Sequence, residues 1–115
     1  MEFESTHRYA RISPRKVRPL ADLIRGKFVD EALDLLRYQP QRGARMLEKV
    51  LKTALANAQD PSQNPGRIVN EHDLFIAEAC IDGGPMFKRM RPRARGMAFM
   101  IKKRMSHIRV KIEEV

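Results

Sequence analysis

The first periodic run of apolar positions lies between residues 13 and 26. Four apolar residues recur there at the spacing of one helix face, namely Val17, Leu20, Ala21 and Ile24. Ser13 and Pro14 favour a helix start, and Gly26 favours a stop. Pro19 falls inside the same run and lacks the N–H needed for its turn. The pattern therefore predicts a helix that is either kinked at Pro19 or begins only near Arg18.

Two further helices are predicted downstream. Asp30 is expected to cap a short helix with Ala32, Leu33 and Leu36 inside, ended or followed by Pro40. From about 41 to 59, apolar residues repeat at spacings of one and three, namely Met46, Leu47, Val50, Leu51, Ala54, Leu55 and Ala58. This stripe is expected to lie in the core.

Two strands follow a turn-rich surface loop at 60–66. Residues 74–81 read as a largely buried strand, whereas Ile108, Val110 and Ile112 alternate with polar residues and predict a strand with one face in solvent. About 15 residues, 82–96, connect these strands, far more than the usual two to five of a hairpin loop. A connection that long in a small domain is either disordered or functional.

Composition bounds what the chain can be. Its 115 residues fit one domain, and Cys80 as the only thiol excludes an intrachain disulfide. The acidic N-terminus does not resemble a secretory leader, and the longest apolar run, 97–101, is too short to span a bilayer. We therefore expect a soluble protein of a reducing compartment, with no membrane partner.

Charge is concentrated in two segments. Residues 7–27 carry seven basic groups and one acid, and residues 83–111 carry ten basic groups and no acid, whereas 28–82 are mildly acidic. Five of the eight residues at 88–95 are cations, which repel one another unless phosphates lie between them. A merely solvated charged face normally mixes both signs. Arginine predominates in the run, which suits contacts with phosphates and unpaired bases. The pattern predicts a polyanion ligand.

No constellation of catalytic or metal-binding groups is apparent. His7, His72 and His107 lie far apart in the sequence, and no ligand spacing or activated nucleophile connects them with Cys80. Cys80 is interpreted as a small buried hydrophobe. The Gly83-Gly84-Pro85 run lacks the spacing of a phosphate-binding loop and precedes no predicted helix, so it is interpreted as a turn. We expect no enzyme, no cofactor, no metal and no small-molecule substrate.

Two aromatic side chains among the basic segments leave alternatives open. For His107, an RNA contact and a plain solvated side chain are comparable interpretations. Tyr9 could stack on a base or cover the sheet, and we favour the core role. A DNA-binding module is a rival class, but the helix at 41–59 uses its stripe for the core and offers no convincing recognition face. A small hydrolase fails for want of an acid, base and nucleophile.

Several spaced motifs in order resemble the family of bacterial large-subunit ribosomal protein twenty-two. They are His7-Arg8-Tyr9-Ala10-Arg11-Ile12-Ser13-Pro14-Arg15-Lys16-Val17-Arg18, Ala21-Asp22-Leu23-Ile24-Arg25-Gly26, Ala54-Leu55-Ala56-Asn57-Ala58, Gly84-Pro85, Lys88-Arg89, Pro92-Arg93-Ala94, Gly96, Lys103-Arg104 and Ser106-His107-Ile108. The chain departs from the family pattern at Pro19, at Gly83 and in Gly96-Met97-Ala98. The resemblance implies an α+β fold of three helices packed on a small three-stranded antiparallel sheet, with a long extended β-hairpin at about 82–97 in a single domain, 1–115.

The resemblance also implies a function. It implies a structural constituent of the large ribosomal subunit, cytoplasmic and in the ribosome, that binds 23S-type rRNA during assembly beside neighbouring ribosomal proteins. The expected rRNA-binding residues are Arg8, Arg11, Arg15, Lys16, Arg18, Arg25, Lys88, Arg89, Arg91, Arg93, Arg95, Lys102, Lys103, Arg104 and His107. The hairpin tip is expected to line the nascent-peptide exit tunnel with Lys88, Arg89, Met90, Arg91, Pro92 and Arg93, where the nascent peptide is a partner.

Overall fold

A computed structural model describes residues 2–60, 62, 65–66, 69–92 and 94–114. Its described part contains strand β1 (Glu2–Ala10), helices α1 (Pro14–Ile24), α2 (Val29–Tyr38) and α3 (Arg42–Gln59), and the long strands β2 (Leu74–Pro92) and β3 (Ala98–Glu114). Short 3-10 turns, η1 (Glu71–Asp73) and η2 (Ala94–Gly96), precede β2 and separate it from β3. The predicted loop at 60–66 lies partly outside the described residues.

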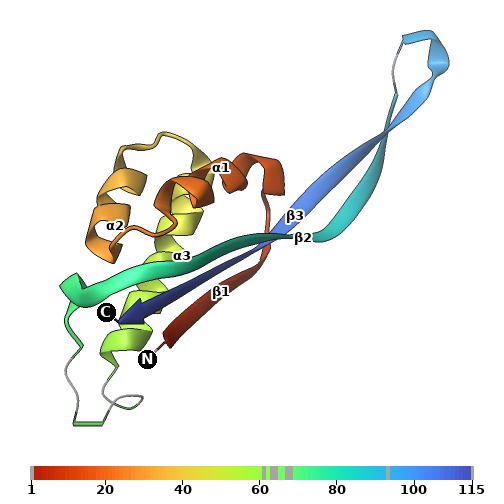
Figure 1. Cartoon of the computed structure of the whole chain (residues 1–115). Coiled ribbons are helices and arrows are strands. Elements are labelled where there is room, and N and C mark those ends of the chain that lie inside the picture. Colours follow the sequence, from red (N-terminus) through yellow and green to blue (C-terminus); the bar gives the residue numbers. More distant parts are fainter. Residues whose placement is uncertain (1, 61, 63–64, 67–68, 93, 115) are drawn as a thin grey trace.

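The three strands form one antiparallel sheet with the order β1-β3-β2. The helices cover one face of this sheet, and β2 and β3 run on together past the helices as a projecting hairpin (Figure 1). The molecule is therefore elongated, with extents of 67 × 27 × 16 Å. This architecture confirms the expected α+β fold with three helices, a three-stranded antiparallel sheet and an extended hairpin.

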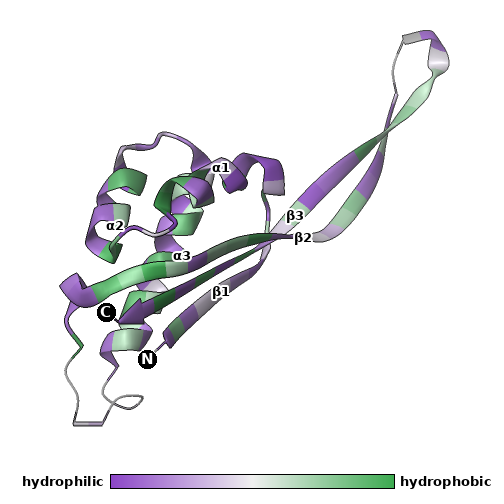
Figure 2. Ribbon diagram, in the orientation of Figure 1, coloured by the Kyte–Doolittle hydropathy of each residue, from purple (hydrophilic) through white to green (hydrophobic). Residues whose placement is uncertain are grey.

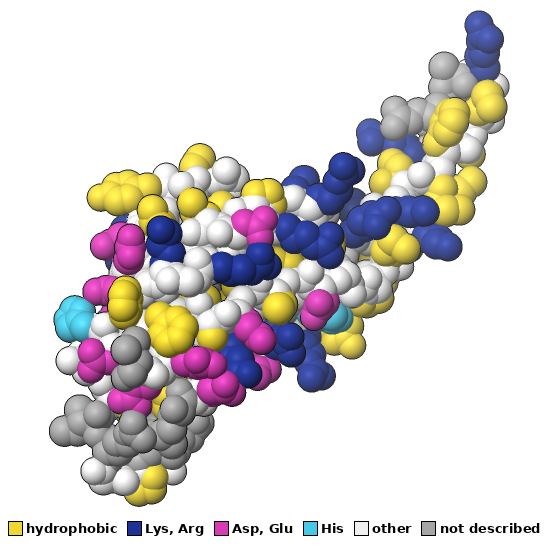
Figure 3. All heavy atoms as spheres, in the orientation of Figure 1, with side chains coloured by type: hydrophobic (Ala, Val, Ile, Leu, Met, Phe, Trp, Pro, Cys, Tyr) yellow, Lys and Arg dark blue, Asp and Glu magenta, His cyan; other side chains and the backbone are white. Residues whose placement is uncertain are grey.

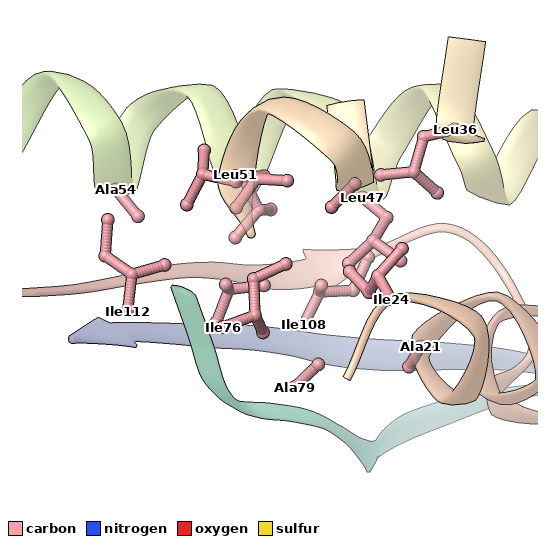
Figure 4. Close-up of a cluster of buried hydrophobic side chains, with 14 of the residues drawn as sticks. Ala21, Ile24, Leu36, Leu47, Leu51, Ala54, Ile76, Ala79, Ile108 and Ile112 are labelled. Carbon is pink, nitrogen blue, oxygen red and sulfur yellow. The ribbon is translucent and has the colours of Figure 1, made fainter. Parts of the chain in front are cut away.

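The core lies between the helices and the covered face of the sheet. Figure 4 shows Leu47 and Leu51 of α3 directed at Ile108 and Ile112 of β3, as the predicted stripes require. These four side chains are fully buried. The apolar colouring of Figure 2 is concentrated on the inward side of the helices and on the body half of the sheet. No described residue of 82–105 belongs to the core, so the hairpin is outside it.

The first helix begins at the predicted Pro14, whereas the second begins one residue before the predicted cap. Helix α1 starts at Pro14 and continues through Pro19, so the alternative start near Arg18 is wrong. Pro19 is exposed, so its ring displaces no core side chain. Because proline has no backbone N–H, the helix loses one backbone hydrogen bond at this position. Helix α2 starts at Val29 after the N-cap residue Phe28, which places Asp30 in the first turn and not at the cap. An antiparallel bridge between Phe28 and Phe75 holds the chain where α2 begins.

Two side chains expected in the core lie outside it. Tyr9 has a φ of 57° at a β-bulge between His7 and Ala10, and its side chain is 59% exposed, so the predicted core role is wrong. The bulge turns Tyr9 out of the alternation. Cys80 is only half-buried, because it pairs with Arg109 on the sheet face that no helix covers. The apolar neighbours of Cys80 in sequence did not reveal which face it takes.

The long connection between the body strands is not a loop. Residues 82–92 pair with β3 from Asp82 opposite His107 to Pro92 opposite Ala98, with one irregularity between Gly83 and Met86. Backbone hydrogen bonding along this ribbon needs no core, which is why a hydrophobicity pattern does not reveal it. The reversal itself falls between Pro92 and Ala98, where Arg95 and Gly96 both have positive φ, 64° and 69°.

Candidate nucleic-acid interface

Most of the basic side chains of the hairpin are exposed and lack acidic partners. We call the part of the β2–β3 hairpin beyond Gly83 the arm. The described cations of the arm are all exposed, namely Lys88, Arg89, Arg91, Arg95, Lys102, Lys103 and Arg104. No ion pair joins any of them to a carboxylate among the described residues, and the sequence has no Asp or Glu from 83 to 111. Arg93 lies outside the described residues. The blue side chains of Figure 3 follow the arm, whereas the magenta ones gather on the body.

The register gives the hairpin two different faces, because residues directly opposite each other share a face. We call one the aromatic face, formed by Phe87, Arg89, Arg91, Phe99, Ile101 and Lys103. We call the other the methionine face, which includes Met86, Lys88, Met90, Pro92, Met100 and Lys102. Both faces combine cations with exposed apolar side chains. Such a surface is charged but not uniformly polar.

A basic groove lies where the hairpin leaves the body. It has a volume of about 540 Å³ and is lined by Arg11, Arg42, Phe87, Arg89, Lys103, Arg104 and Met105. A smaller hollow of about 290 Å³ shares four of these residues and adds Ser13 and Lys16 at the start of α1. No carboxylate lines either hollow among the described residues. The groove therefore joins the two basic segments of the sequence into one surface.

Arg42 is a groove residue that the sequence-based list omits. It is the first residue of α3, and the chain there runs close to α1: a Cβ atom at Gly43 would lie 3.3 Å from side-chain atoms of Ile12, Val17 and Leu20. This close packing carries Arg42 to Arg11 and the base of the hairpin. Its position just before the core stripe of α3 was the only signal in the sequence.

Arg18 and Arg25 have a second role at the sheet edge. Strand β2 is an edge strand, and its outward carbonyls need partners. Arg25 donates to the Ala79 carbonyl from Nε at 2.9 Å and from Nη2 at 2.6 Å, and its Nη1 also pairs with Asp22. Arg18 donates from Nη2 to the Ile81 carbonyl at 3.2 Å. These guanidinium groups hold α1 against β2, so they are less free for a ligand than the groove cations.

Other predicted residues vary in availability. Arg8, Arg11, Arg15 and Lys16 are exposed. His107 is half-buried, and its Nδ1 accepts a hydrogen bond from the Tyr9 backbone N–H at 3.1 Å, while the two rings meet edge to face with centroids 5.0 Å apart. This contact leaves only Nε2 of His107 for an outside partner. His107 therefore helps to hold the Tyr9 bulge, a structural role that neither sequence-based alternative included.

The open face of the sheet carries its own counter-charges. Lys111 Nζ lies 2.9 Å from Glu2 Oε2, and Arg109 Nη2 lies 3.9 Å from Glu78 Oε2. The hydrogen bond from Lys111 holds the pKa of Glu2 below its ordinary value, and the neighbouring Glu2 raises the pKa of Glu113. Because these cations face acids, they add less to the uncompensated positive charge of the described residues than the groove and the hairpin do.

Among the described residues, no group of three or more His, Cys, Asp or Glu side chains could hold a metal ion. Within that same part of the chain, no helix is both long and apolar enough to cross a bilayer. The fold and its surface define a class of small α+β domain whose cationic groove and arm are suited to a polyanion.

The particular family follows from comparison with known proteins. The family model described as Ribosomal protein L22p/L17e matches residues 5–113, so the chain belongs to this family of ribosomal proteins. A protein of Rhodopirellula baltica named Large ribosomal subunit protein uL22 is 64% identical over 99% of this chain and 96% of its own length. Its namesakes from Caldicellulosiruptor saccharolyticus and Thermus thermophilus are 54% and 50% identical, over 96% and 99% of this chain and 86% and 96% of their own lengths. The family is not enzymatic, which confirms that expectation.

Proposed function

We propose that this chain is a structural constituent of the large ribosomal subunit that binds large-subunit rRNA through its groove and hairpin. The observation that carries the proposal is the continuous surface of exposed cations without acidic partners, from Arg11 and Arg42 in the groove to Arg95 at the tip. Membership of a ribosomal protein family supports it. The partners are 23S-type rRNA and neighbouring large-subunit proteins, and the location is the ribosome of the cytoplasm.

The groove holds the body on the RNA, and the hairpin extends the contact with RNA away from the body. Guanidinium groups bind phosphate oxygens in a fixed fork, so Arg11, Arg42 and Arg104 can hold the body on folded RNA. The arm has backbone pairing but no core of its own, so little holds it except its ladder. Phosphates between its cations remove the repulsion that the free arm experiences. RNA is therefore the partner that completes the structure of the arm.

The tip of the arm lines the nascent-peptide exit tunnel. Near the tip, Met90 pairs with Met100 and Pro92 with Ala98, which gives the methionine face a stretch without charge. Met90 is 66% exposed and Met100 is 55% exposed. An uncharged, non-aromatic wall with Lys88 and Arg91 fixed on rRNA beside it suits a passage that must not retain peptides of varied sequence. The nascent peptide is then a transient partner.

Assembly tests the first part of the proposal. Tagged protein should cosediment with large subunits after a high-salt wash that removes loosely bound proteins. The double variant Arg11→Gln/Arg42→Gln should cosediment less than Arg37→Gln, whose exposed side chain lies on α2 outside the groove. Recovery of wild-type protein only at the top of the gradient would contradict a role in the large subunit.

Crosslinking tests the tunnel. A photo-crosslinking residue at position 90 should react with a stalled nascent peptide on intact ribosomes, whereas one at position 91, on the opposite face, should react with rRNA. If position 90 reacts with rRNA alone, the methionine face does not line the tunnel.

A further inference from the structure

The aromatic face of the hairpin carries large apolar groups that stay partly exposed in the described structure. Phe87 and Phe99 are each 49% exposed, and Ile101 between them in the ladder is half-buried. Exposed single apolar residues are common on proteins, but a repeated apolar position along one face of an arm is a patch. The patch is interleaved with Arg89, Arg91 and Lys103 and contains no acid. Its composition is therefore both aromatic and cationic.

The geometry of the patch is that of an extended platform. Phe87 lies opposite Lys103, and Phe99 lies opposite Arg91, so the two rings are on the same face four residues apart along the ladder. At a strand rise of about 3.3 Å per residue, that separation is about 13 Å. Arg89 lies between the two positions, with its Cζ 5.4 Å from the Phe87 ring centroid. The platform thus alternates flat aromatic and guanidinium surfaces.

The platform is continuous with the basic groove. Phe87, Arg89 and Lys103 belong to the aromatic face and also line the groove, together with Arg11 and Arg42 of the body. A polyanion seated in the groove therefore meets the aromatic face where the arm begins. The methionine face has no aromatic ring from Met86 to Pro92. The two faces thus present different chemistry to whatever surrounds the arm.

We propose that the aromatic face is a stacking platform for unpaired bases of rRNA, with Phe87 and Phe99 as the stacking residues and the interleaved cations on the adjoining phosphates. The inference rests on the proposed function and adds the kind of contact. Aromatic rings spaced among Arg and Lys bind single-stranded nucleic acid in this way, since every base has a π face. Paired bases in an A-form helix present backbone and groove edges, which such rings do not read. An acidic peptide would match the cations but not the rings.

A matched pair of substitutions tests the platform. Phe99→Leu and Met100→Leu alter neighbouring residues on opposite faces, and both leave an apolar side chain in the strand. Binding to a transcript of Rhodopirellula baltica large-subunit rRNA should weaken about fivefold or more for Phe99→Leu, and less than about twofold for Met100→Leu. The dependence on salt should be the same in both, because no charge changes. Equal losses in the two variants, or no loss in either, would overturn the stacking role.

A fluorescent reporter gives a second, independent reading. The chain has no Trp, so Phe99→Trp and Met100→Trp each introduce a single indole. Addition of the transcript should quench the indole at 99 and protect it from iodide, whereas the indole at 100 should change little. If the transcript binds with steep salt dependence but both indoles respond alike, the platform is wrong while the rRNA-binding function stands. Absence of binding by the wild type at low salt would contradict both.

Discussion

The arginines of this protein divide into those bound to its own backbone and those left to solvent. Arg18 and Arg25 donate to edge carbonyls of β2. Arg45 Nη2 donates to the carbonyls of Leu36 and Arg37 at the end of α2, and both of these hydrogen bonds are 2.9 Å long. By contrast, Arg15 is exposed and has no recorded hydrogen bond or ion pair among the described residues. The same residue type therefore serves stability in one place and remains available to a ligand in another.

Replacing an arginine that binds the sheet edge should lower the free energy of unfolding more than replacing an exposed arginine does. In Arg25→Met the carbonyl of Ala79 loses both donors, so the free energy of unfolding should fall by about 1 kcal/mol. Arg15→Met should change stability by less than about 0.5 kcal/mol, as exposed substitutions do. Urea denaturation of both variants provides the measurement. A smaller loss for Arg25→Met than for Arg15→Met would show that the edge contact contributes nothing.

Glu48 gives the protein an acid-sensitive contact. It is 9% exposed, with Oε2 2.7 Å from Arg45 Nη1 and Oε1 3.2 Å from Lys52 Nζ. Burial alone would raise the pKa of Glu48, but the hydrogen bond and charge of Lys52, with Arg45, outweigh burial and hold it below the ordinary 4.5. Because the pKa is lower in the folded state, this contribution is complete above about pH 4.5 and disappears as the pH falls through the folded pKa.

Glu48→Gln should therefore destabilise the fold at neutral pH and not in acid. We expect a loss of about 1 kcal/mol at pH 7. The difference from the wild type should shrink as the pH falls below 4.5. Denaturation curves across this range measure it. A difference that grows toward low pH would mean that the folded-state pKa of Glu48 is raised and not lowered.

At the scale of elements, the hairpin depends on the body, but the body does not depend on the hairpin. The body sheet has a covered face and a core, whereas the arm beyond Gly83 has two strands and two open faces. A two-stranded ribbon of this kind is at best marginally stable in water. The arm is thus the part of the fold most open to ordering by a ligand.

Excision of the arm should leave the body folded. Gly83 pairs with Ser106, so an Asn-Gly turn in place of residues 84–105 would close the body strands into a tight hairpin. Because no described residue of that segment is buried, the unfolding free energy should change by less than about 2 kcal/mol. Thermal melting followed by circular dichroism measures the change. A larger loss would mean that the arm packs on the body.

At the scale of the whole molecule, the separation of charge matters more than the net charge of +9. The acids pair with cations on the open sheet face, and the groove and arm keep their positive charge uncompensated. Figure 3 shows this division along the long axis. A polyanion would therefore be oriented along the arm and away from the acidic end of the body.

Binding to rRNA should be steeply salt-dependent. Contact with roughly six phosphates should give a slope of log K against log salt of about −4 or steeper. Arg11→Gln/Arg42→Gln should flatten it by about 1.5, since each lost contact removes about 0.7 to 0.9. Arg37→Gln, with the same type of change away from the groove, should leave it unaltered. A wild-type slope shallower than about −3 would contradict a phosphate-dominated interface.

The sequence alone determined those features that follow from local periodicity and composition. The stripes of α1 and α3, the alternation around Val110 and the two basic segments each lie within one stretch of chain, so pattern and charge reveal them. The resemblance to the family also indicated a third strand, which is β1 in the structure, and the projecting arm. The hydrophobicity pattern predicted neither of them. Strand β1 buries only Phe3 and Ala10, and no described residue of the arm beyond Gly83 is buried, so neither has a clear apolar stripe.

Only the tertiary structure decided how distant residues meet. The bulge that exposes Tyr9, the edge contacts of Arg18 and Arg25, and the approach of α3 that adds Arg42 to the groove all depend on packing between separate elements. The register of the ladder decided which side chains of the arm share a face, because a shift of one residue in one strand would exchange its two faces. Such pairings leave no periodic mark in the sequence, since the contacts that fix them join residues far apart along the chain.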